Sequence, residues 1–265
     1  MEIDNATLFA TLGHAKRLEV FRLLVRRYPD AVPAGEIASA LELKASTLSV
    51  YLNALQHVNL IHQNREGTTL RYRVNLEQIS QMGNDLVKDC CQGRVDLCFR
   101  DSPDAKERRR VLFLCSANSA RSLMAEQILN DRAKGGLRAA SAGTRPAMCA
   151  HQTALDVLRQ KGHEVTNLQP ELMADVVTKS SYDFVFSLCD QAANEPPLSF
   201  LGYPIMSHWG LPDPVRTVGS ADEQREAFLN VYDRLEHKIE RFIDVTQCMQ
   251  TRMEMQRAVD EIARL

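Results

Sequence analysis

The chain has 265 residues, of which 45% are hydrophobic and 25% charged, a composition typical of a globular protein with two modest domains. Its net charge of −2 excludes a global attraction to nucleic acid or to membranes, so any DNA binding must come from a local surface. The N-terminus does not resemble a leader peptide, and no apolar run approaches about 18 residues. We therefore expect a cytoplasmic protein with no membrane partner.

The seven cysteines, Cys90, Cys91, Cys98, Cys115, Cys149, Cys189 and Cys248, favour thiol or metalloid chemistry over a disulfide framework. From residue 6 to 27 apolar side chains recur at helical spacing, with a break at Gly13-His14, which predicts one short and one longer helix. Residues 34–41 and 44–57 predict two further helices with the spacing of a helix-turn-helix.

The second helix of this pair has a core stripe of Leu48, Leu52 and Leu55. Small side chains then face away from the core, as suits contact with bases in the major groove. These candidate DNA-binding residues are Ser46, Thr47, Ser49, Val50 and Asn53.

Residues 60–74 predict two alternating strands around Glu66-Gly67, with Arg71 and Arg73 on the face opposite Tyr72. A helix-turn-helix followed by such a hairpin is a winged helix, in which Arg65, Arg71 and Arg73 would contact phosphates. A small helical domain that binds a protein partner is the alternative. Residues 1–88 contain 10 Lys/Arg and 9 Asp/Glu, so charge does not decide between the two.

The order of elements and three motifs resemble the arsenic-responsive (ArsR-type) repressors over roughly residues 5–90. The motifs are residues 12–18, the segment Ala45-Ser-Thr-Leu-Ser-Val-Tyr-Leu52, and Arg65-Glu-Gly67 with Arg71-Tyr-Arg73. The resemblance implies a homodimer that binds operator DNA and leaves it when a metal or metalloid binds.

The commonest inducer site of that family, a Cys-x-Cys, would fall at residues 30–33, where no thiol occurs. Cys90, Cys91 and Cys98 lie just past the winged helix instead, in a run similar to the inducer site of one arsenite-sensing branch. Soft thiolates prefer soft ions, and trivalent arsenic takes three of them. Antimonite would bind by the same chemistry. A zinc site is disfavoured because tetrahedral zinc needs a fourth ligand, and none is close in sequence. Three reduced thiols without a role are the alternative.

Residues 99–110 are polar and predict a linker. Beyond them strands alternate with helices: strands at 111–114, 137–142, 184–188 and near 203–206, and helices at about 122–133, 151–161 and 221–243. This order predicts an α/β domain with a parallel sheet. The expected boundaries are 1–88 for the mostly α winged helix, 89–108 for the inducer segment and linker, 109–245 for the α/β domain and 246–265 for an amphipathic packing or dimer helix.

A buried strand at 111–114 leads into Cys115, and Arg121 follows six positions later at the start of a helix. Backbone N–H groups, the helix N-terminus and the Arg121 guanidinium can converge there on a tetrahedral anion, and the same field should depress the Cys115 pKa. A buried structural cysteine is the alternative. The candidate oxyanion-binding residues are Ser116, Ala117, Asn118, Ser119, Ala120, Arg121 and Ser122.

Two further residues could serve this loop. Asp213, on the Pro-stiffened segment 209–214, is suitably placed to donate a proton to a departing oxygen. Cys189 follows a predicted central strand and would lie on the same sheet edge as Cys115. Taken alone, Asp213 could be a simple turn residue and Cys189 a core residue.

Together these motifs resemble the low-molecular-weight tyrosine phosphatase fold, and more closely its arsenate reductase branch, over residues 109 to about 245. They are Cys115-x5-Arg121-Ser122, Met124-Ala-Glu126, Ser141-Ala-Gly-Thr144, residues 182–190 and Trp209-x3-Asp213-Pro214. The resemblance implies attack of the Cys115 thiolate on arsenate, proton donation by Asp213 and a Cys115–Cys189 disulfide. It implies no tightly bound cofactor, but an external thioredoxin or glutathione system.

The sequence departs from thioredoxin-coupled reductases at three positions. Pro196 replaces their third redox cysteine, and Ala117 and Ala120 stand where Gly and Cys are usual. A Cβ at 117 would crowd the anion if that residue needed a positive φ. Cys149 or Cys248 could substitute for the third thiol. A regulator with a degenerate oxyanion-binding domain, and a DNA-binding tyrosine phosphatase, remain alternatives, although Val215 replaces the aromatic residue that such phosphatases use.

Overall fold

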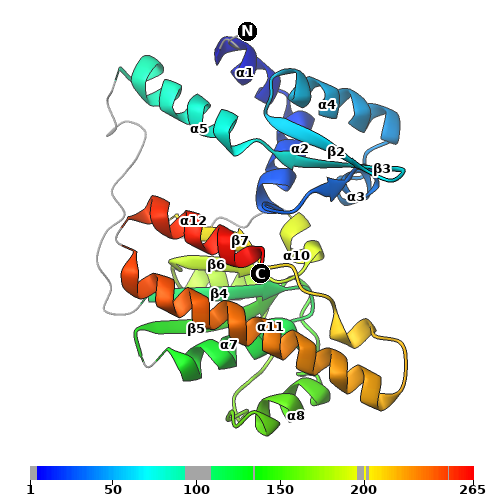
Figure 1. Ribbon diagram of the computed structural model, residues 1–265, viewed down its shortest axis with the longest axis vertical. Coiled ribbons are helices and arrows are strands. Elements are labelled where there is room, and N and C mark those ends of the chain that lie inside the picture. Colours follow the sequence, from blue (N-terminus) through cyan, green and yellow to red (C-terminus); the bar gives the residue numbers. More distant parts are fainter. Residues whose placement is uncertain (1–4, 93–108, 134, 196–199, 201–202, 250) are drawn as a thin grey trace. The chain divides into compact units, whose positions relative to one another are not determined.

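The structure, a computed structural model, describes residues 5–92, 109–133, 135–195, 200, 203–249 and 251–265. The chain forms two compact units, residues 1–103 and 104–265. Figure 1 shows the elements of each unit. Each unit has its own core.

The first unit is a small helical domain with a three-stranded sheet. Two short helices precede a helix pair, a β-hairpin and a further helix. The elements are α1 (Asn5–Leu12), α2 (Ala15–Arg26), β1 (Val32–Pro33), α3 (Ala34–Ala40), α4 (Ala45–His57), β2 (Ile61–Glu66), β3 (Thr69–Val74), α5 (Leu76–Asp85) and the π-helical turn η1 (Leu86–Cys90). The strand order is β1-β3-β2, with antiparallel pairing throughout.

The break between α1 and α2 has a local cause. The Nδ1 atom of His14 accepts a hydrogen bond from the Arg17 N–H at 3.4 Å and so caps α2. Leu48, Leu52 and Leu55 of α4 are buried together with Val20 and Leu24 of α2 and other core residues, as their spacing predicts. The hairpin turns at Gly67, whose φ of 59° favours glycine. The predicted winged helix-turn-helix is thus confirmed.

The second unit is a parallel α/β domain. Its strands lie in the order β5-β4-β6-β7, all parallel. Its elements are β4 (Arg109–Cys115), α7 (Arg121–Arg132), β5 (Leu137–Gly143), α8 (Gln152–Gln160), α9 (Met173–Lys179), β6 (Phe184–Ser187), α10 (Asp190–Asn194), β7 (Ile205–His208), the 3₁₀ turn η2 (Pro214–Arg216), α11 (Ala221–Cys248) and α12 (Arg252–Ala263). The predicted fold class is confirmed.

Side chains of β4 alternate between two cores, one on each face of the sheet. Val111 and Phe113 pack in a large cluster with residues of α7, α8, α11 and α12. Leu112 and Leu114 pack on the other face against residues of α9. Both faces of the sheet are therefore covered, and the central strands are apolar at residues 111–115 and 184–186, as expected of a parallel sheet.

The element bounds differ from the sequence prediction most clearly toward the end of the chain. The last strand is Ile205–His208 and not 203–206, α11 extends to Cys248, and the final helix begins only at Arg252. The short helices α9 and α10, of seven and five residues, were not predicted.

Helix α12 packs on the second unit. Met255, Val259 and Ile262 are buried in the same core as Trp209 of the segment after β7. The Trp209 Nε1–H donates to the Val259 carbonyl at 3.4 Å. Helix α12 is thus an integral part of this core.

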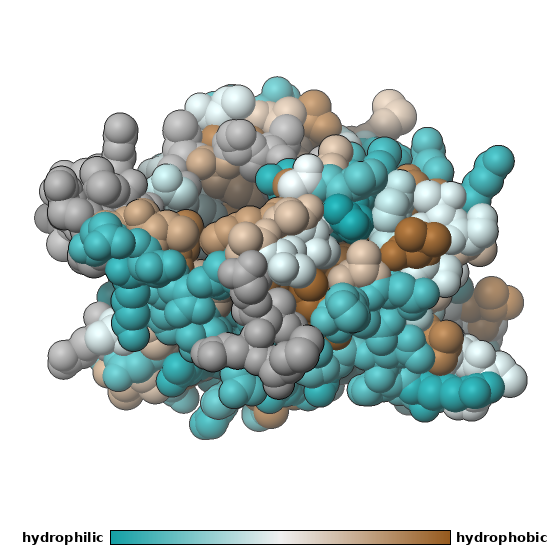
Figure 2. All heavy atoms as spheres, turned by 90° about the horizontal axis from the view of Figure 1, so that it is seen from above, coloured by the Kyte–Doolittle hydropathy of each residue, from teal (hydrophilic) through white to brown (hydrophobic). Residues whose placement is uncertain are grey.

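The surface is mixed. In the space-filling view of Figure 2, apolar side chains lie in separate small groups among hydrophilic ones on the visible face. Among the described residues, no helix is both long enough and apolar enough to cross a bilayer.

Truncation of the α12 core contact should destabilise the second unit. Ile262→Ala leaves a cavity at a side chain that is 4% exposed, so the free energy of unfolding should fall by about 2–5 kcal/mol in urea denaturation. Met253→Ala, at a residue 67% exposed, is the control and should change it by less than about 0.5 kcal/mol. Equal effects would contradict the packing role of α12.

Candidate functional site

The carboxyl ends of three adjacent parallel strands bring the candidate residues to one edge of the sheet. Cys115 is the last residue of β4, Cys189 follows β6, and Asp213 follows β7 on the segment 209–213. Ligand sites of open α/β sheets form at this edge. The parallel topology therefore gathers residues that are up to 98 positions apart in the sequence.

Asn118 is the hydrogen-bonding centre of the loop 115–122. It is fully buried and has a φ of 47°, a left-handed conformation that Asn tolerates better than most residues. Its backbone N–H donates to the Cys115 Sγ at 3.1 Å. Its side-chain Nδ2 donates to the hydroxyls of Ser122 and Ser141, both at 2.8 Å, and its Oδ1 accepts from the Glu171 N–H at 2.7 Å.

The segment after β5 fixes the carbonyls of this loop. N–H groups of Thr144, Arg145, Ala147 and His151 donate to the carbonyls of Cys115, Ser116, Ala117 and Ser119, respectively, at 2.8–3.2 Å. A Cβ at Gly143 would lie 2.6 Å from the Ser116 carbonyl oxygen, so this close approach requires glycine. Because these hydrogen bonds occupy the carbonyls on one side of the loop, the loop N–H groups can bind an anion on the opposite side.

Ala117 does not have the positive φ that would make its Cβ an obstacle. Within the described residues of this loop, only Asn118 is left-handed. The N–H groups of Ala117, Ser119 and Ala120 donate to no carbonyl in the part of the chain that the structure describes. They are therefore available to an oxyanion.

The expected depression of the Cys115 pKa is wrong for this structure. Cys115 is 2% exposed, and burial raises the pKa of its thiol. The Ser122 hydroxyl, 2.9 Å from the Cys115 Sγ, and the Arg121 charge act in the opposite direction but do not outweigh burial, and the neighbouring Cys189 adds to the increase. The thiol form is therefore favoured in the resting site.

Arg121 contacts the segment that carries Asp213. Its guanidinium donates to the Leu211 carbonyl at 3.0 Å and forms an ion pair with the Asp213 carboxylate, also at 3.0 Å. Asp213 additionally accepts a hydrogen bond from the Val215 N–H at 3.3 Å. Because Arg121 begins α7 directly after the loop and its charge acts on Cys115, Asp213 and an incoming oxyanion would compete for one guanidinium.

Cys189 lies beside Cys115. The two thiols and Ala192 form one buried cluster, in which Cys189 is 6% exposed. The Ser116 hydroxyl lies 3.3 Å from the Cys189 Sγ and also donates to Gln191 at 3.0 Å. Cys189 is the N-cap residue of α10, and its Sγ accepts from the Ala192 N–H at 3.5 Å. The structure thus brings together Cys115, Arg121, Asp213 and Cys189.

Glu126 is a nearby residue to which the sequence analysis assigned no role. Its carboxyl accepts a hydrogen bond from the Ser141 hydroxyl at 2.7 Å, and Ser141 in turn contacts Asn118. Burial raises the Glu126 pKa to about 7, and the charge of Glu171 adds to the increase. Only the motif match around Met124-Ala-Glu126 could have suggested it, because the contact to Ser141 depends on the packing of α7 on β5.

In the first unit, the residues that are expected to contact DNA bases lie mainly on the exposed face of α4. Ser46, Ser49 and Asn53 are exposed, Val50 is 65% exposed, and Thr47 is half-buried. The buried Leu stripe of α4 explains this arrangement, since it turns the opposite face outward.

The wing arginines differ from one another. Arg71 forms an ion pair with Glu66 at 2.7 Å and donates to the Ala31 carbonyl at 3.2 Å, so it is held within the domain. Arg65 is exposed and donates to the Gly67 carbonyl at 3.1 Å, whereas Arg73 is exposed on β3 opposite His62. Arg65 and Arg73 are therefore better placed for phosphate than Arg71.

Two of the three candidate metalloid ligands lie at the end of the first unit. Cys90 is exposed in the last position of η1, and Cys91 follows it and is half-buried. Cys98, like Pro196 and most of the predicted linker, lies outside the described residues.

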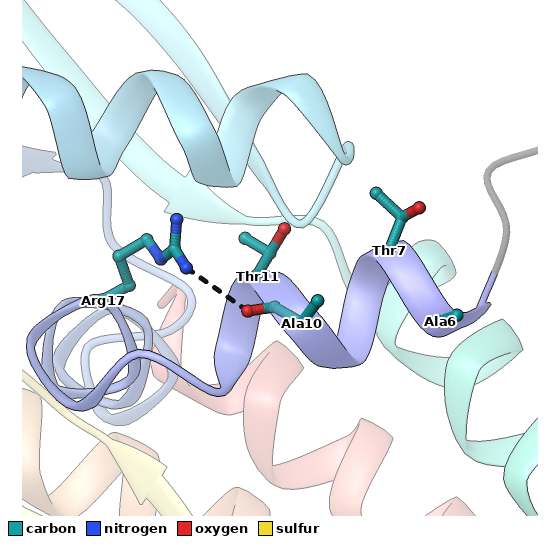
Figure 3. Close-up of a pocket in the computed structure, with 5 residues that line it drawn as sticks. All are labelled: Ala6, Thr7, Ala10, Thr11 and Arg17. Atoms are coloured by element: carbon teal, nitrogen blue, oxygen red, sulfur yellow. Dashed lines mark hydrogen bonds between the residues drawn. The ribbon is translucent and has the colours of Figure 1, made fainter.

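A separate hollow lies in the first unit. It has a volume of about 460 Å³ and is lined by Ala6, Thr7, Ala10, Thr11 and Arg17, and Figure 3 shows the Arg17 guanidinium donating to the Ala10 carbonyl. Its lining contains neither a thiol nor a carboxylate, so it is no candidate for the thiol reaction.

The Glu126 carboxyl should make stability depend on pH. Its raised pKa means that the unfolded chain loses this proton from about pH 4.5, while the folded chain keeps it until about pH 7. The free energy of unfolding should therefore fall by up to ~3 kcal/mol as the pH rises through this window. Urea titrations at pH 5 and 8 measure this fall in the free energy of unfolding. Glu126→Gln should abolish the fall that Glu126 causes, whereas the control Glu164→Gln, at an exposed residue, should leave it unchanged.

Comparison with known proteins agrees with both units. Residues 110–256 match the family model of low molecular weight phosphotyrosine protein phosphatase, and residues 12–64 match a helix-turn-helix domain. The arsenate reductase of Bacillus subtilis is 29% identical over 142 residues, which are 52% of this chain and 97% of that protein. The glutaredoxin arsenate reductase of Synechocystis is 27% identical over 135 residues, 51% and 96% of the two chains.

Among solved structures, an arsenate reductase in the oxidized state is 26% identical, with a TM-score of 0.44, over 51% of this chain and 97% of that one. The two family models and the curated relatives confirm the expected combination of a helix-turn-helix domain with a phosphatase-fold domain. Because the phosphatase model matches residues 110–256, more than half of the chain, the protein belongs to the low molecular weight phosphotyrosine protein phosphatase family and has a winged helix-turn-helix domain fused at its N-terminal side.

Proposed function

We propose that this protein is an arsenic-responsive transcriptional repressor fused to a thiol-dependent arsenate reductase. The observation that carries the enzymatic half is the buried pair of Cys115 and Cys189 at the anion cradle. A phosphatase needs a nucleophile, an arginine and an acid, whereas reduction of arsenate needs a second thiol to supply electrons. The arsenate reductases among the relatives support the same substrate.

The first step joins Cys115 to arsenic. Arsenate binds to the loop N–H groups and to Arg121, and this releases Asp213 from its ion pair with the guanidinium. The Cys115 sulfur attacks arsenic, and the proton of the thiol reaches the departing oxygen through the Asp213 carboxyl group, so that oxygen leaves as water. Loop donors aimed at Cys115 stabilise the thiolate as it forms and so offset part of the effect of burial on its pKa.

The second step transfers electrons. The Cys189 sulfur attacks the Cys115 sulfur, an S–S bond forms, and the S–As bond breaks with its electron pair remaining on arsenic. Arsenic is thereby reduced from the pentavalent to the trivalent state, and the Cys189 proton ends on an arsenite oxygen. The product disulfide must be reduced by an external thiol system of the thioredoxin or glutathione type, with no tightly bound cofactor. Cys149, which is exposed on the segment that pairs with the loop, and Cys248 are candidate relays.

The first unit would act as the DNA reader and arsenite sensor. The exposed residues Ser46, Ser49, Val50 and Asn53 of α4, with Thr47 beside them, suit a recognition helix, and Arg65 and Arg73 suit phosphate contacts. Cys90 and Cys91 lie together at the end of η1 and would bind trivalent arsenic, or antimony, with Cys98 as third thiolate.

A homodimer fits the surface of α5. Leu76, Ile79, Met82 and Leu86 recur at helical spacing along α5 and the start of η1; Ile79 and Met82 pack against the core of the first unit, whereas Leu76 is 44% and Leu86 39% exposed. A second copy could cover this face, as the symmetric half-sites of operators require. Arsenite bound at Cys90 and Cys91 would then act on the end of the same helix.

A regulator that binds oxyanion without turnover is the second candidate. The raised Cys115 pKa favours it, because a neutral thiol is a weak nucleophile. Arsenate binding without arsenite release would support this candidate. A tyrosine phosphatase is disfavoured because Val215, 39% exposed, offers no aromatic surface beside Asp213.

Removal of the Asp213 charge should separate binding from turnover. Asp213→Asn frees Arg121 and removes a like charge, so phosphate should protect Cys115 from iodoacetamide at a several-fold lower concentration. Arsenate reduction should fall by about 10²-fold or more, because the proton donor is lost. Asp233→Asn on α11 is the control. Weaker phosphate protection in Asp213→Asn would contradict the proposed competition.

The two thiols should fail at different steps. With thioredoxin and glutathione systems assayed side by side, Cys115→Ser should give neither arsenite nor disulfide. Cys189→Ser should still consume one arsenate per chain without releasing arsenite, since the covalent adduct cannot be resolved. Cys149→Ser and Cys248→Ser test the relay. No arsenite from the wild type with either system would refute the reductase.

Arsenite should control DNA binding through the thiols of the first unit. The wild-type protein should leave operator DNA in a gel-shift assay when arsenite is added, and a Cys90→Ser/Cys91→Ser variant should stay bound. Cys149→Ser, also at an exposed thiol, is the matched control and should respond as the wild type does. If arsenite also released the Cys90→Ser/Cys91→Ser variant from operator DNA, this inducer site would be ruled out.

A further inference from the structure

His208 of β7 is a buried histidine whose ring joins two residues on either side of Cys189. It is 1% exposed. Its Nδ1 lies 2.8 Å from the Ser187 hydroxyl, and its Nε2 lies 3.1 Å from an Asp190 carboxylate oxygen. A neutral ring with its proton on Nε2 satisfies both contacts, with Ser187 donating to Nδ1 and Nε2–H donating to Asp190.

The two residues that His208 contacts delimit the turn that carries Cys189. Ser187 is the last residue of β6, and Asp190 is the first residue of α10. Strand pairing places His208 directly beside Ser187. The imidazole therefore spans the turn Leu188-Cys189 from the strand to the helix.

Backbone hydrogen bonds to the neighbouring strand and segment anchor this turn at Leu188, whereas within the described residues the Cys189 carbonyl accepts a backbone hydrogen bond only from Ala193 of α10 itself, at 3.1 Å. The Leu188 N–H donates to the Leu114 carbonyl at 2.7 Å, and the Leu188 carbonyl accepts from the Leu211 N–H at 3.1 Å. Beyond it, α10 has only five residues, too few to be stable by itself. The His208–Asp190 contact extends the anchoring past Cys189, where the hydrogen bond from Ser116 to Gln191 also holds α10.

A thiol pair forms a disulfide only in a narrow geometry, with Cβ atoms about 3.5–4.5 Å apart. Small displacements of a reacting group cost large factors in rate or equilibrium. Cys189 already lies in one cluster with Cys115, and its Sγ is 3.3 Å from the Ser116 hydroxyl next to Cys115.

We propose that His208 is a positioning residue that holds Cys189 beside Cys115 by joining Ser187 to Asp190 across the Cys189 turn. It acts on the second redox step and not on the anion cradle. This role in arsenate reduction rests on the proposed function, whereas the positioning of the two thiols can be tested without arsenate.

Equilibration of the full-length protein with glutathione buffers measures this positioning. Cys115 and Cys189 lose two electrons and two protons as they form a disulfide, and one glutathione disulfide takes them up to give two glutathione thiols. Peptide mapping by mass spectrometry gives the fraction of Cys115–Cys189 disulfide. His208→Ala should shift the equilibrium at least about tenfold toward the two thiols. Asp190→Ala, a substitution of a side chain that is 56% exposed, should shift it in the same direction without endangering the fold.

His163→Ala is the matched control. His163 is also a buried histidine that joins two partners, Asp131 and the Tyr232 hydroxyl, but it belongs to the segment after α8. It should leave the thiol equilibrium within about twofold of wild type. Protection of Cys115 from iodoacetamide by phosphate should be unchanged in His208→Ala and Asp190→Ala, because the cradle residues are untouched.

The outcomes separate the two proposals. The positioning role would be overturned if His208→Ala and Asp190→Ala left the thiol–disulfide equilibrium unchanged. It would also be overturned if these variants lost the protection of Cys115 by phosphate together with the disulfide. A wild-type protein that forms no Cys115–Cys189 disulfide in glutathione would overturn it as well. If the wild type forms the disulfide with glutathione but not with arsenate, the reductase proposal alone fails.

Discussion

The geometry of the anion site depends on the buried side chain of Asn118. Its amide joins the loop to Ser122 on α7, to Ser141 on β5 and to the Glu171 backbone, while its own N–H points at the Cys115 sulfur. A left-handed residue in the middle of the loop reverses the chain there, so that successive N–H groups can face one point. Apolar packing alone could not fix such a loop, because it would leave these buried polar groups without partners.

The resting site balances opposing electrostatic effects. Burial keeps the Cys115 thiol protonated, and Asp213 occupies the guanidinium that an oxyanion would use. A bound oxyanion would displace Asp213 from Arg121 and so deliver a carboxyl group at the moment when a proton must move. Anion binding and acid release would thus be coupled through one arginine, which explains why both groups lie at the same sheet edge.

The proposed fusion links a chemical reaction to its own regulation. Arsenate resembles phosphate and offers soft thiolates little to bind, whereas trivalent arsenic is a thiophile that suits Cys90 and Cys91. A sensor on the same chain would therefore respond to the product of the second unit and not to its substrate. The short turn with Cys189, anchored by His208, would set how readily that product forms.

The sequence by itself determined the two-part organisation and most of the order of elements, and it predicted the candidate thiols, arginine and acid that the structure brings to one sheet edge. Sequence periodicity was sufficient to predict α4, which buries one stripe of leucines, and β4, which buries an apolar run. It was not sufficient for α9 and α10, which are too short to show a period, or for the start of β7. Tertiary structure alone decided that burial outweighs Arg121 at Cys115, that Arg71 is held by Glu66, that Glu126 contacts Ser141 and that His208 contacts Asp190. Those features depend on contacts between residues far apart in the chain, which no local pattern encodes.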